Sequence, residues 1–146
     1  MVIKSEDGTV LILRTCNADM TSYGGFVWPT SGPVEAPDWE PTMVCGHGLH
    51  GLLWGEGSER YLSALSDAKW LVFRTAASDV MHGDGELTDK CKARRGVVEY
   101  CGDRAGAIGY LMANGDGGRQ RHSHGGLRRH SHGGLRRGYS NIAVEW

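Results

Sequence analysis

Residues 115–146 are built around a short repeat that cannot form a hydrophobic core. Residues 121–128 are Arg-His-Ser-His-Gly-Gly-Leu-Arg, and residues 129–136 repeat the same sequence. Each unit contains a single leucine and neither a β-branched nor an aromatic residue, so burial cannot offset the entropy lost on ordering. We therefore expect a disordered Gly/Arg/His tail over residues 115–146 and a single globular domain over residues 1–114.

The charge is divided between these two parts. Residues 1–114 contain 10 Lys and Arg against 15 Asp and Glu, whereas residues 115–146 contain 6 Arg against 2 acidic residues. An acidic domain argues against nucleic acid as its ligand, because phosphate contacts need clustered basic residues. The tail, rich in Arg and His, predicts at most weak binding of nucleic acid or metal.

The chain shows no segment typical of membrane insertion or export. No stretch approaches 18 apolar residues, and no charged leader with an apolar run and a cleavage site begins the sequence. We therefore expect no membrane partner, no signal peptide and a cytoplasmic location. The four cysteines form no Cys-x-x-Cys pair, which predicts reduced thiols.

Hydrophobic patterning predicts short strands and few helices. Residues 9–15, 69–75 and 96–101 are β-rich runs and predict strands, and the apolar, glycine-rich residues 48–55 are strand-like. A helix is predicted over residues 104–113, after Gly102-Asp103, with Asp103 as its N-cap. The predicted class is α+β, a compact domain of short strands with one or two helices.

A long loop separates the first two regular segments. Four prolines and several glycines between residues 16 and 48 exclude a long helix there. Residues 76–95 are polar and are also predicted to be irregular. Because rigid loops on a scaffold commonly carry recognition, residues 17–57 are the predicted contact surface. Trp28, Trp39 and Trp54 are its predicted ligand-binding residues.

The segment Cys45-Gly-His47-Gly-Leu-His50 places three metal-ligating residue types within six positions. Zinc sites use four such ligands in a tetrahedral arrangement. The fourth ligand would come from Cys91, Cys101 or His82. The alternative is a turn in which His47 is at the surface and a partly buried His50 is hydrogen-bonded to the backbone, with no cofactor.

The same histidine is the candidate general base of a small enzyme. Acid–base or transferase chemistry would pair His50 with a carboxylate, supplied by Glu56, Glu99 or Asp103. The structural alternatives are that Asp103 only caps the helix and that Glu99 faces solvent from an alternating strand. The sequence is thus compatible with two classes of function, an enzyme and a non-enzymatic binding module.

Several longer motifs resemble an uncharacterised domain family of phage and prophage proteins. They are residues 13–21 (LRTCNADMT), 24–29 (GGFVWP), 32–39 (GPVEAPDW), 45–57 (CGHGLHGLLWGEG), 67–72 (DAKWLV) and 95–103 (RGVVEYCGD). The resemblance covers about residues 10–110. It implies an accessory binding module of a phage or mobile element in a bacterial host. Such a module would capture a host protein or a small molecule, for example in counter-defence.

Members of that family are commonly followed by octapeptide repeats resembling Gly-Thr-Ala-Thr-Ala-Gly-Tyr-Arg. The repeat of this chain has the same period but a different composition. Written as CGG CAC AGC CAC GGC GGG CTA CGG, it becomes Gly-Thr-Ala-Thr-Ala-Gly-Tyr when the frame is shifted by one base. We therefore interpret the tail as an out-of-frame version of that repeat.

A second resemblance is to ADP-ribosyltransferase-like folds, in which a strand and a helix border a cleft for NAD. Residues 45–57 would form that border, with Glu99 or Glu86 as the late acidic residue. This alternative implies an enzyme with NAD as cofactor.

Overall fold

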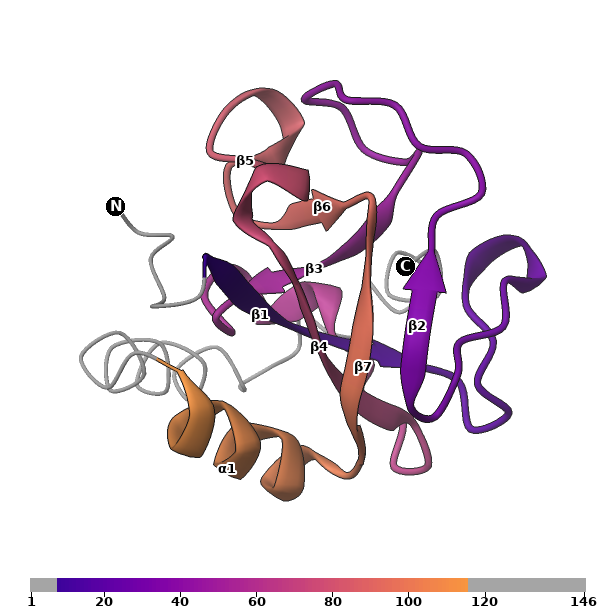
Figure 1. Cartoon of the computed structure of the whole chain (residues 1–146). Coiled ribbons are helices and arrows are strands. Elements are labelled where there is room, and N and C mark those ends of the chain that lie inside the picture. The colour runs from indigo at the N-terminus through magenta and orange to yellow at the C-terminus, as the bar shows by residue number, and fades with distance from the viewer. Residues whose placement is uncertain (1–7, 116–146) are drawn as a thin grey trace.

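The structure, a computed structural model, describes residues 8–115 (Figure 1). Within this range seven antiparallel strands form one sheet, in the order β2-β7-β4-β1-β3-β6-β5, accompanied by a single α-helix. The strands are β1 (Thr9–Cys16), β2 (Gly32–Glu35), β3 (Leu49–Leu53), β4 (Lys69–Ala76), β5 (Val80–His82), β6 (Cys91–Ala93) and β7 (Arg95–Gly102). The helix is α1 (Arg104–Asn114), and four 3-10 turns are η1 (Tyr23–Gly25), η2 (Glu59–Tyr61), η3 (Ala77–Asp79) and η4 (Gly85–Leu87). The predicted α+β class is confirmed, whereas the predicted tail lies outside the described residues.

The centre of the sheet is the pair β1–β4. The two strands are in register over their whole length, from Thr9 opposite Ala76 to Cys16 opposite Lys69. Both are nearly continuous apolar runs, and Val10 to Leu13 are fully buried. Continuous apolar sequence is what a strand covered on both faces requires, so these strands form the middle layer of the core.

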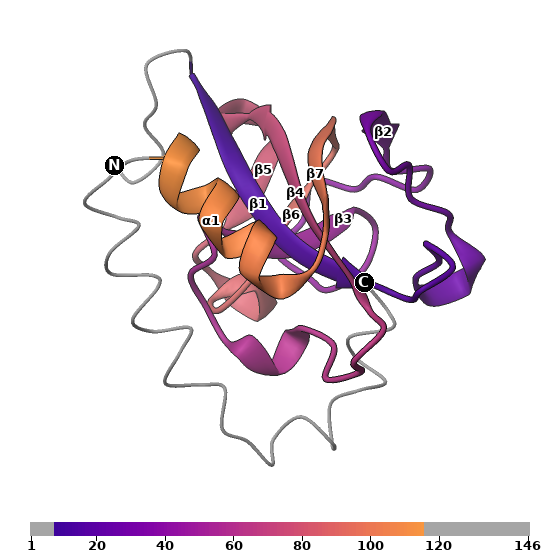
Figure 2. The ribbon, with the colours of Figure 1, turned by 90° about the horizontal axis from the view of Figure 1, so that it is seen from below.

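Helix α1 covers one face of the sheet, where it packs against β4 and β7 (Figure 2). Its first turn is capped as predicted, because the Asp103 carboxylate accepts a 2.9 Å hydrogen bond from the Gly106 N–H. Ala107 and Leu111, one turn apart, are buried in the core. The helix thereby covers part of the face to which β4 directs Arg74.

The opposite face is covered by the loop that follows β1. Trp28 is 2% exposed, and its ring centroid lies 5.5 Å from that of Phe73 in β4. Its indole N–H donates a 3.1 Å hydrogen bond to the Ser22 hydroxyl. Trp28 thus anchors this loop on the sheet, since an aromatic side chain buries a large area at one position.

The edge strands are short. β2 spans four residues and contains Pro33, and β5 spans three. Both were predicted as loop, and the prediction that residues 76–95 are irregular is wrong, since β5 and β6 pair there in antiparallel register. Strands of three or four residues are too short to show an alternating pattern.

A bulge interrupts the pairing of β4 and β7. Val72 lies opposite Tyr100, but Phe73 lies opposite Val98, so Glu99 is the extra residue. A bulge re-aims the side chain that it inserts. Here it directs Glu99 toward Arg74 and the helix residue Tyr110.

Candidate functional site

A cleft of about 450 Å³ lies within the Pro/Gly-rich segment that follows β1. Aromatic and glycine residues between positions 22 and 28 form one wall, and the turn before β3, residues 46–48, forms the other. It brings together three predicted residues from distant positions, namely Trp28, His47 and His50. We take this cleft, called the loop cleft below, as the candidate functional site.

His50 lies at the base of the loop cleft and is only 4% exposed. Its Nε2 accepts a 3.0 Å hydrogen bond from the Gly46 N–H, and a backbone hydrogen bond links the ring to Gly48. Burial, together with the positive charges of Lys90, Arg14 and Lys92, lowers the pKa of His50 to about 3. A neutral imidazole whose Nε2 lone pair is already engaged favours the structural alternative over a general base.

His47 occupies the rim of the cleft. It has a positive φ of 59°, in a turn flanked by two glycines. Its Nδ1 lies 3.6 Å from Asp38 and 3.9 Å from Glu40, and its side chain is 45% exposed. This is the surface position expected of His47 in the alternative without a cofactor.

The three predicted metal ligands are not brought together as a set. The Cys45 sulfur lies 2.6 Å from Lys90 Nζ, His50 Nε2 is engaged by Gly46, and His47 faces Asp38. Within residues 8–115 no group of three His, Cys, Asp or Glu side chains is arranged to hold a metal ion. The residues present therefore do not fit the tetrahedral zinc site considered for this segment.

The three predicted ligand-binding tryptophans lie in different places. Trp28 lines the loop cleft. Trp39 is partly buried, with its ring centroid 5.7 Å from Lys92 Nζ, and Trp54 is 1% exposed in the core. Trp54 has a φ of 58°, and its backbone N–H donates a hydrogen bond to the Leu11 carbonyl. Only Trp28 lines the loop cleft.

The predicted carboxylates are dispersed as well. Glu99 accepts a 2.8 Å hydrogen bond from Arg74 and a 2.6 Å hydrogen bond from the Tyr110 hydroxyl. Burial beside Glu99 raises the pKa of Tyr110. Asp103 caps α1, and Glu56 follows β3 in a turn closed by the Leu53 carbonyl. None of the three lines the loop cleft, so the structure does not assemble an acid–base pair with His50 there.

Sequence reasoning missed the buried cations that organise this region. Arg14 is fully buried, donates 3.0 Å and 2.9 Å hydrogen bonds to the His50 and Thr15 carbonyls, and stacks 4.2 Å over Trp28. Burial lowers the pKa of Arg14 to about 9. The signal in the sequence is a single arginine inside an apolar strand, which must find partners if the strand is buried.

Lys92 is the second buried cation and is also fully buried. Its Nζ donates to the Thr42 hydroxyl at 3.2 Å and to the Val44 and Gly46 carbonyls at 3.1 and 3.0 Å. These three acceptors match the three donors of an ammonium group. Lys92 thus fixes the loop that forms one wall of the cleft.

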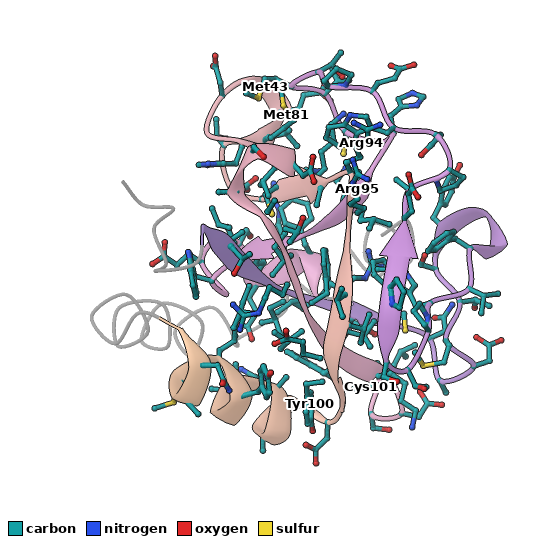
Figure 3. All side chains as sticks on the ribbon, viewed as in Figure 1. Met43, Met81, Arg94, Arg95, Tyr100 and Cys101 are labelled. Carbon is teal, nitrogen blue, oxygen red and sulfur yellow. The ribbon has the colours of Figure 1, made fainter. Side chains whose placement is uncertain are left out.

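Two further clefts lie elsewhere on the described surface. One, of about 600 Å³, lies at the start of α1 and contains Glu59, Trp70 and Arg104. The other, of about 720 Å³, lies along β2 and β7, where Arg74 and Glu99 line it. Figure 3 labels Arg94 and Arg95 at one end of β7 and Tyr100 and Cys101 at the other, toward α1. Of the predicted site residues, Asp103 lines the first of these clefts and Glu99 the second.

Comparison with known proteins identifies relatives of a single kind. The chain is 43% identical over 112 residues to an ice nucleation protein from Pseudomonas fluorescens, a match covering 77% of this chain and 9% of the relative. It is 39% identical over 107 residues to one from Xanthomonas campestris pv. translucens (72% and 7%), and 45% over 107 residues to ice nucleation protein InaA from Pantoea ananas (73% and 8%). The chain thus spans less than a tenth of the length of these three relatives. No solved structure matches.

These relatives correct the expected origin and role. The expectation of a phage or prophage counter-defence module is wrong, because the matching proteins are named ice nucleation proteins of Pseudomonas, Xanthomonas and Pantoea. The alternative of an ADP-ribosyltransferase-like enzyme built on His50 gains no support from the geometry either, because Glu56, Glu86, Glu99 and Asp103 do not line the loop cleft with His50. Within residues 8–115 no helix is long and apolar enough to cross a bilayer. The cytoplasmic location and the predicted ligands stay predictions.

One part of the expected resemblance is confirmed. The motifs that suggested an uncharacterised family lie between residues 10 and 110, and a family model described as Domain of unknown function (DUF7666) matches residues 10–108. The matched range begins in β1 and ends within α1, so it includes all seven strands. The chain belongs to the DUF7666 family.

Proposed function

We propose that this domain is a folded accessory module of ice nucleation, working as a small part of a much larger protein. The observation that carries the proposal is the extent of the match. It covers 77% of this chain at 43% identity, yet only 9% of the ice nucleation protein from Pseudomonas fluorescens. Most of that relative therefore lies outside the shared domain.

The shape of the described domain supports an accessory role rather than the ice-templating role itself. A surface that nucleates ice must present regularly spaced groups over a flat area as wide as the first stable ice embryo. Here α1 covers one face of the sheet, and the loop with Trp28 covers the other. Six large apolar side chains are exposed among the described residues: Tyr23, Val27, Val44, Leu65, Val97 and Met112. They come from the loops, β7 and α1, which does not make one flat array.

The contacts of the predicted site residues also support a role without catalysis. His50 is neutral, buried and hydrogen-bonded to the backbone at Gly46. Glu99 is bound by Arg74 and Tyr110, and Asp103 caps a helix. These groups hold the fold together, which is what a module that positions a larger partner surface requires.

A droplet-freezing assay tests the proposal. In the Pseudomonas fluorescens relative, the region of 112 matched residues is either deleted or replaced by the matching part of this chain. We expect the deletion to lower the freezing temperature of droplets containing equal amounts of protein, and the replacement to retain it. Droplets that contain this chain alone should freeze at the same temperature as droplets of buffer.

Two glycine variants of the replacement protein test whether the inserted domain must be folded to retain the freezing temperature. Gly51→Ala introduces a clash in β3, whereas Gly109→Ala meets nothing within 4 Å. We expect the first to behave like the deletion and the second like the unmodified replacement. A deletion that leaves the freezing temperature unchanged at matched expression would overturn the proposed function.

A further inference from the structure

A lysine and a cysteine meet unusually closely beside the loop cleft. Lys90 Nζ lies 2.6 Å from Cys45 Sγ, although the residues are 45 positions apart. Even N–H···O hydrogen bonds, with the smaller oxygen acceptor, are about 2.7–3.2 Å long. The two atoms are thus closer than an ordinary hydrogen bond to sulfur would bring them.

The cysteine is clamped on both sides. Its own N–H donates a 2.7 Å hydrogen bond to Glu86 Oε1. The carbonyls of its two neighbours, Val44 and Gly46, accept hydrogen bonds from Lys92 Nζ. The backbone at Cys45 is therefore held by contacts that do not involve Lys90.

The lysine is held independently as well. Lys90 is 7% exposed, and its Nζ lies 4.5 Å from the centroid of the Tyr61 ring. The Tyr61 hydroxyl in turn donates to Asp89, the residue before Lys90. Cys45 is only partly buried, so we expect a small oxidant to reach its sulfur while the amine is already in place.

We propose that Cys45 and Lys90 are an oxidative modification site at which a peroxide joins Sγ to Nζ through a single oxygen atom. In the first step the sulfur of the Cys45 thiol attacks one peroxide oxygen and the O–O bond breaks; the departing hydroxide takes the thiol proton, so that a sulfenic acid and one water form. In the second step an N–O bond forms between the sulfenic oxygen and the amine, while one O–H and one N–H bond break. The two protons and two electrons released reduce a second peroxide to two waters.

The atoms and electrons balance over both steps. One thiol, one amine and two hydrogen peroxide molecules give one N–O–S bridge and three waters. Reduction by two molecules of a dithiol returns the thiol and the amine and releases the bridging oxygen as water. The bridge ties the loop wall at Cys45 to the residue that precedes β6.

The other cysteines provide the contrast. Cys16 and Cys91 are buried, and burial raises the pKa of Cys16 to about 11. Cys101 resembles Cys45 in being partly buried, but its sulfur lies 3.9 Å from the sulfur of Met20. Cys101 is therefore the matched control for an accessible thiol without the lysine contact.

Peptide mass spectrometry of the full chain, treated with hydrogen peroxide and digested without reductant, tests the proposal. We expect a cross-linked peptide pair containing Cys45 and Lys90, with one oxygen gained and two hydrogens lost, that separates on treatment with dithiothreitol. The variants Lys90→Arg and Cys45→Ser should abolish it, whereas Cys101→Ser should retain it. Circular dichroism of each variant verifies that it is folded.

Three results would overturn the assignment. The first is a Cys45 oxidised to sulfenic or sulfinic acid, or to a disulfide, while Lys90 stays unmodified. The second is a Cys45–Lys90 cross-link without the added oxygen, which would mean a direct S–N bond. The third is a cross-link that persists in folded Lys90→Arg protein, which would place the lysine elsewhere.

Discussion

Arg104, the first residue of α1, donates a 2.8 Å hydrogen bond to the carboxylate of Glu59 in η2. The Glu59 side chain is 3% exposed, whereas that of Arg104 is 42% exposed. The guanidinium also lies 5.5 Å from the Trp70 ring centroid at the start of β4. This pair joins the helix to the segment between β3 and β4.

Removing the Arg104 side chain should destabilise the fold, because it leaves the Glu59 carboxylate buried without its arginine. We expect Arg104→Ala to lower the free energy of unfolding by about 3 kcal/mol, measured by urea denaturation. The control is Arg95→Ala, which removes a 3.5 Å ion pair with Asp79 in which the arginine side chain is 51% exposed. That variant should lose less than about 1 kcal/mol, and equal losses would contradict the assignment.

The buried His50 predicts a pH-dependent stability. Its pKa is about 3 in the folded protein and about 6.5 when unfolded, so the unfolded chain binds the additional proton. The stability that a neutral His50 contributes is therefore complete above about pH 6.5 and is lost as the pH falls toward 3. Between pH 6.5 and 5 the loss should be about 1.5–2 kcal/mol, measured by urea denaturation.

Two histidine variants isolate that contribution. In His50→Gln the difference in unfolding free energy between pH 6.5 and 5 should shrink by most of the 1.5–2 kcal/mol estimated above. In His47→Gln, which alters an exposed side chain, the difference should be unchanged. A pH profile that is the same in all three proteins would show that His50 titrates normally.

Gly51 in β3 is a test of close packing. A Cβ at this position would collide with the Ile12 side chain and lie 2.8 Å from the Leu13 carbonyl oxygen. We expect Gly51→Ala to lower the thermal midpoint and the unfolding free energy, the latter by about 3 kcal/mol. Gly109→Ala, in the open on α1, should instead raise the free energy by about 0.5–1 kcal/mol. An unchanged unfolding free energy in Gly51→Ala would mean that β1 and β3 separate easily.

The repeat in residues 115–146 leads to a prediction about the reading frames of the gene. If the tail is an out-of-frame version of a Thr/Ala-rich octapeptide, a neighbouring frame should encode Gly-Thr-Ala-Thr-Ala-Gly-Tyr across residues 121–136. The nucleotide sequence of the gene decides this directly. Codons that give no such repeat in either alternative frame would exclude the hypothesis.

The long elements of the fold were predictable, because their sequences carry their own pattern. The strands expected over residues 9–15, 69–75 and 96–101 are β1, β4 and β7 to within one residue at each end, and the Asp103 cap starts α1 where expected. β2 was predicted as loop because it contains Pro33, and three-residue strands such as β5 are too short to show an alternating hydrophobic pattern. Their pairing arises from tertiary contacts.

The candidate site was predictable only in part. The meeting of Trp28 with His50 depends on how the first loop folds back over the sheet, which local sequence does not encode. Lys92 was missed because lysine is rarely fully buried, and only the carbonyls of the facing loop explain its position. The bulge at Glu99 likewise becomes visible only in the register of two distant strands.

The two edges of the sheet have a consequence for crowded copies of this domain. An exposed strand edge is a template onto which another chain can add, and long flat edges promote polymerisation. Here β2 ends the sheet on one side with four residues that include a proline, and β5 ends it on the other with three. Such short edges offer an incoming strand few backbone groups to pair with, which disfavours polymerisation through the sheet edges when many copies are held close together.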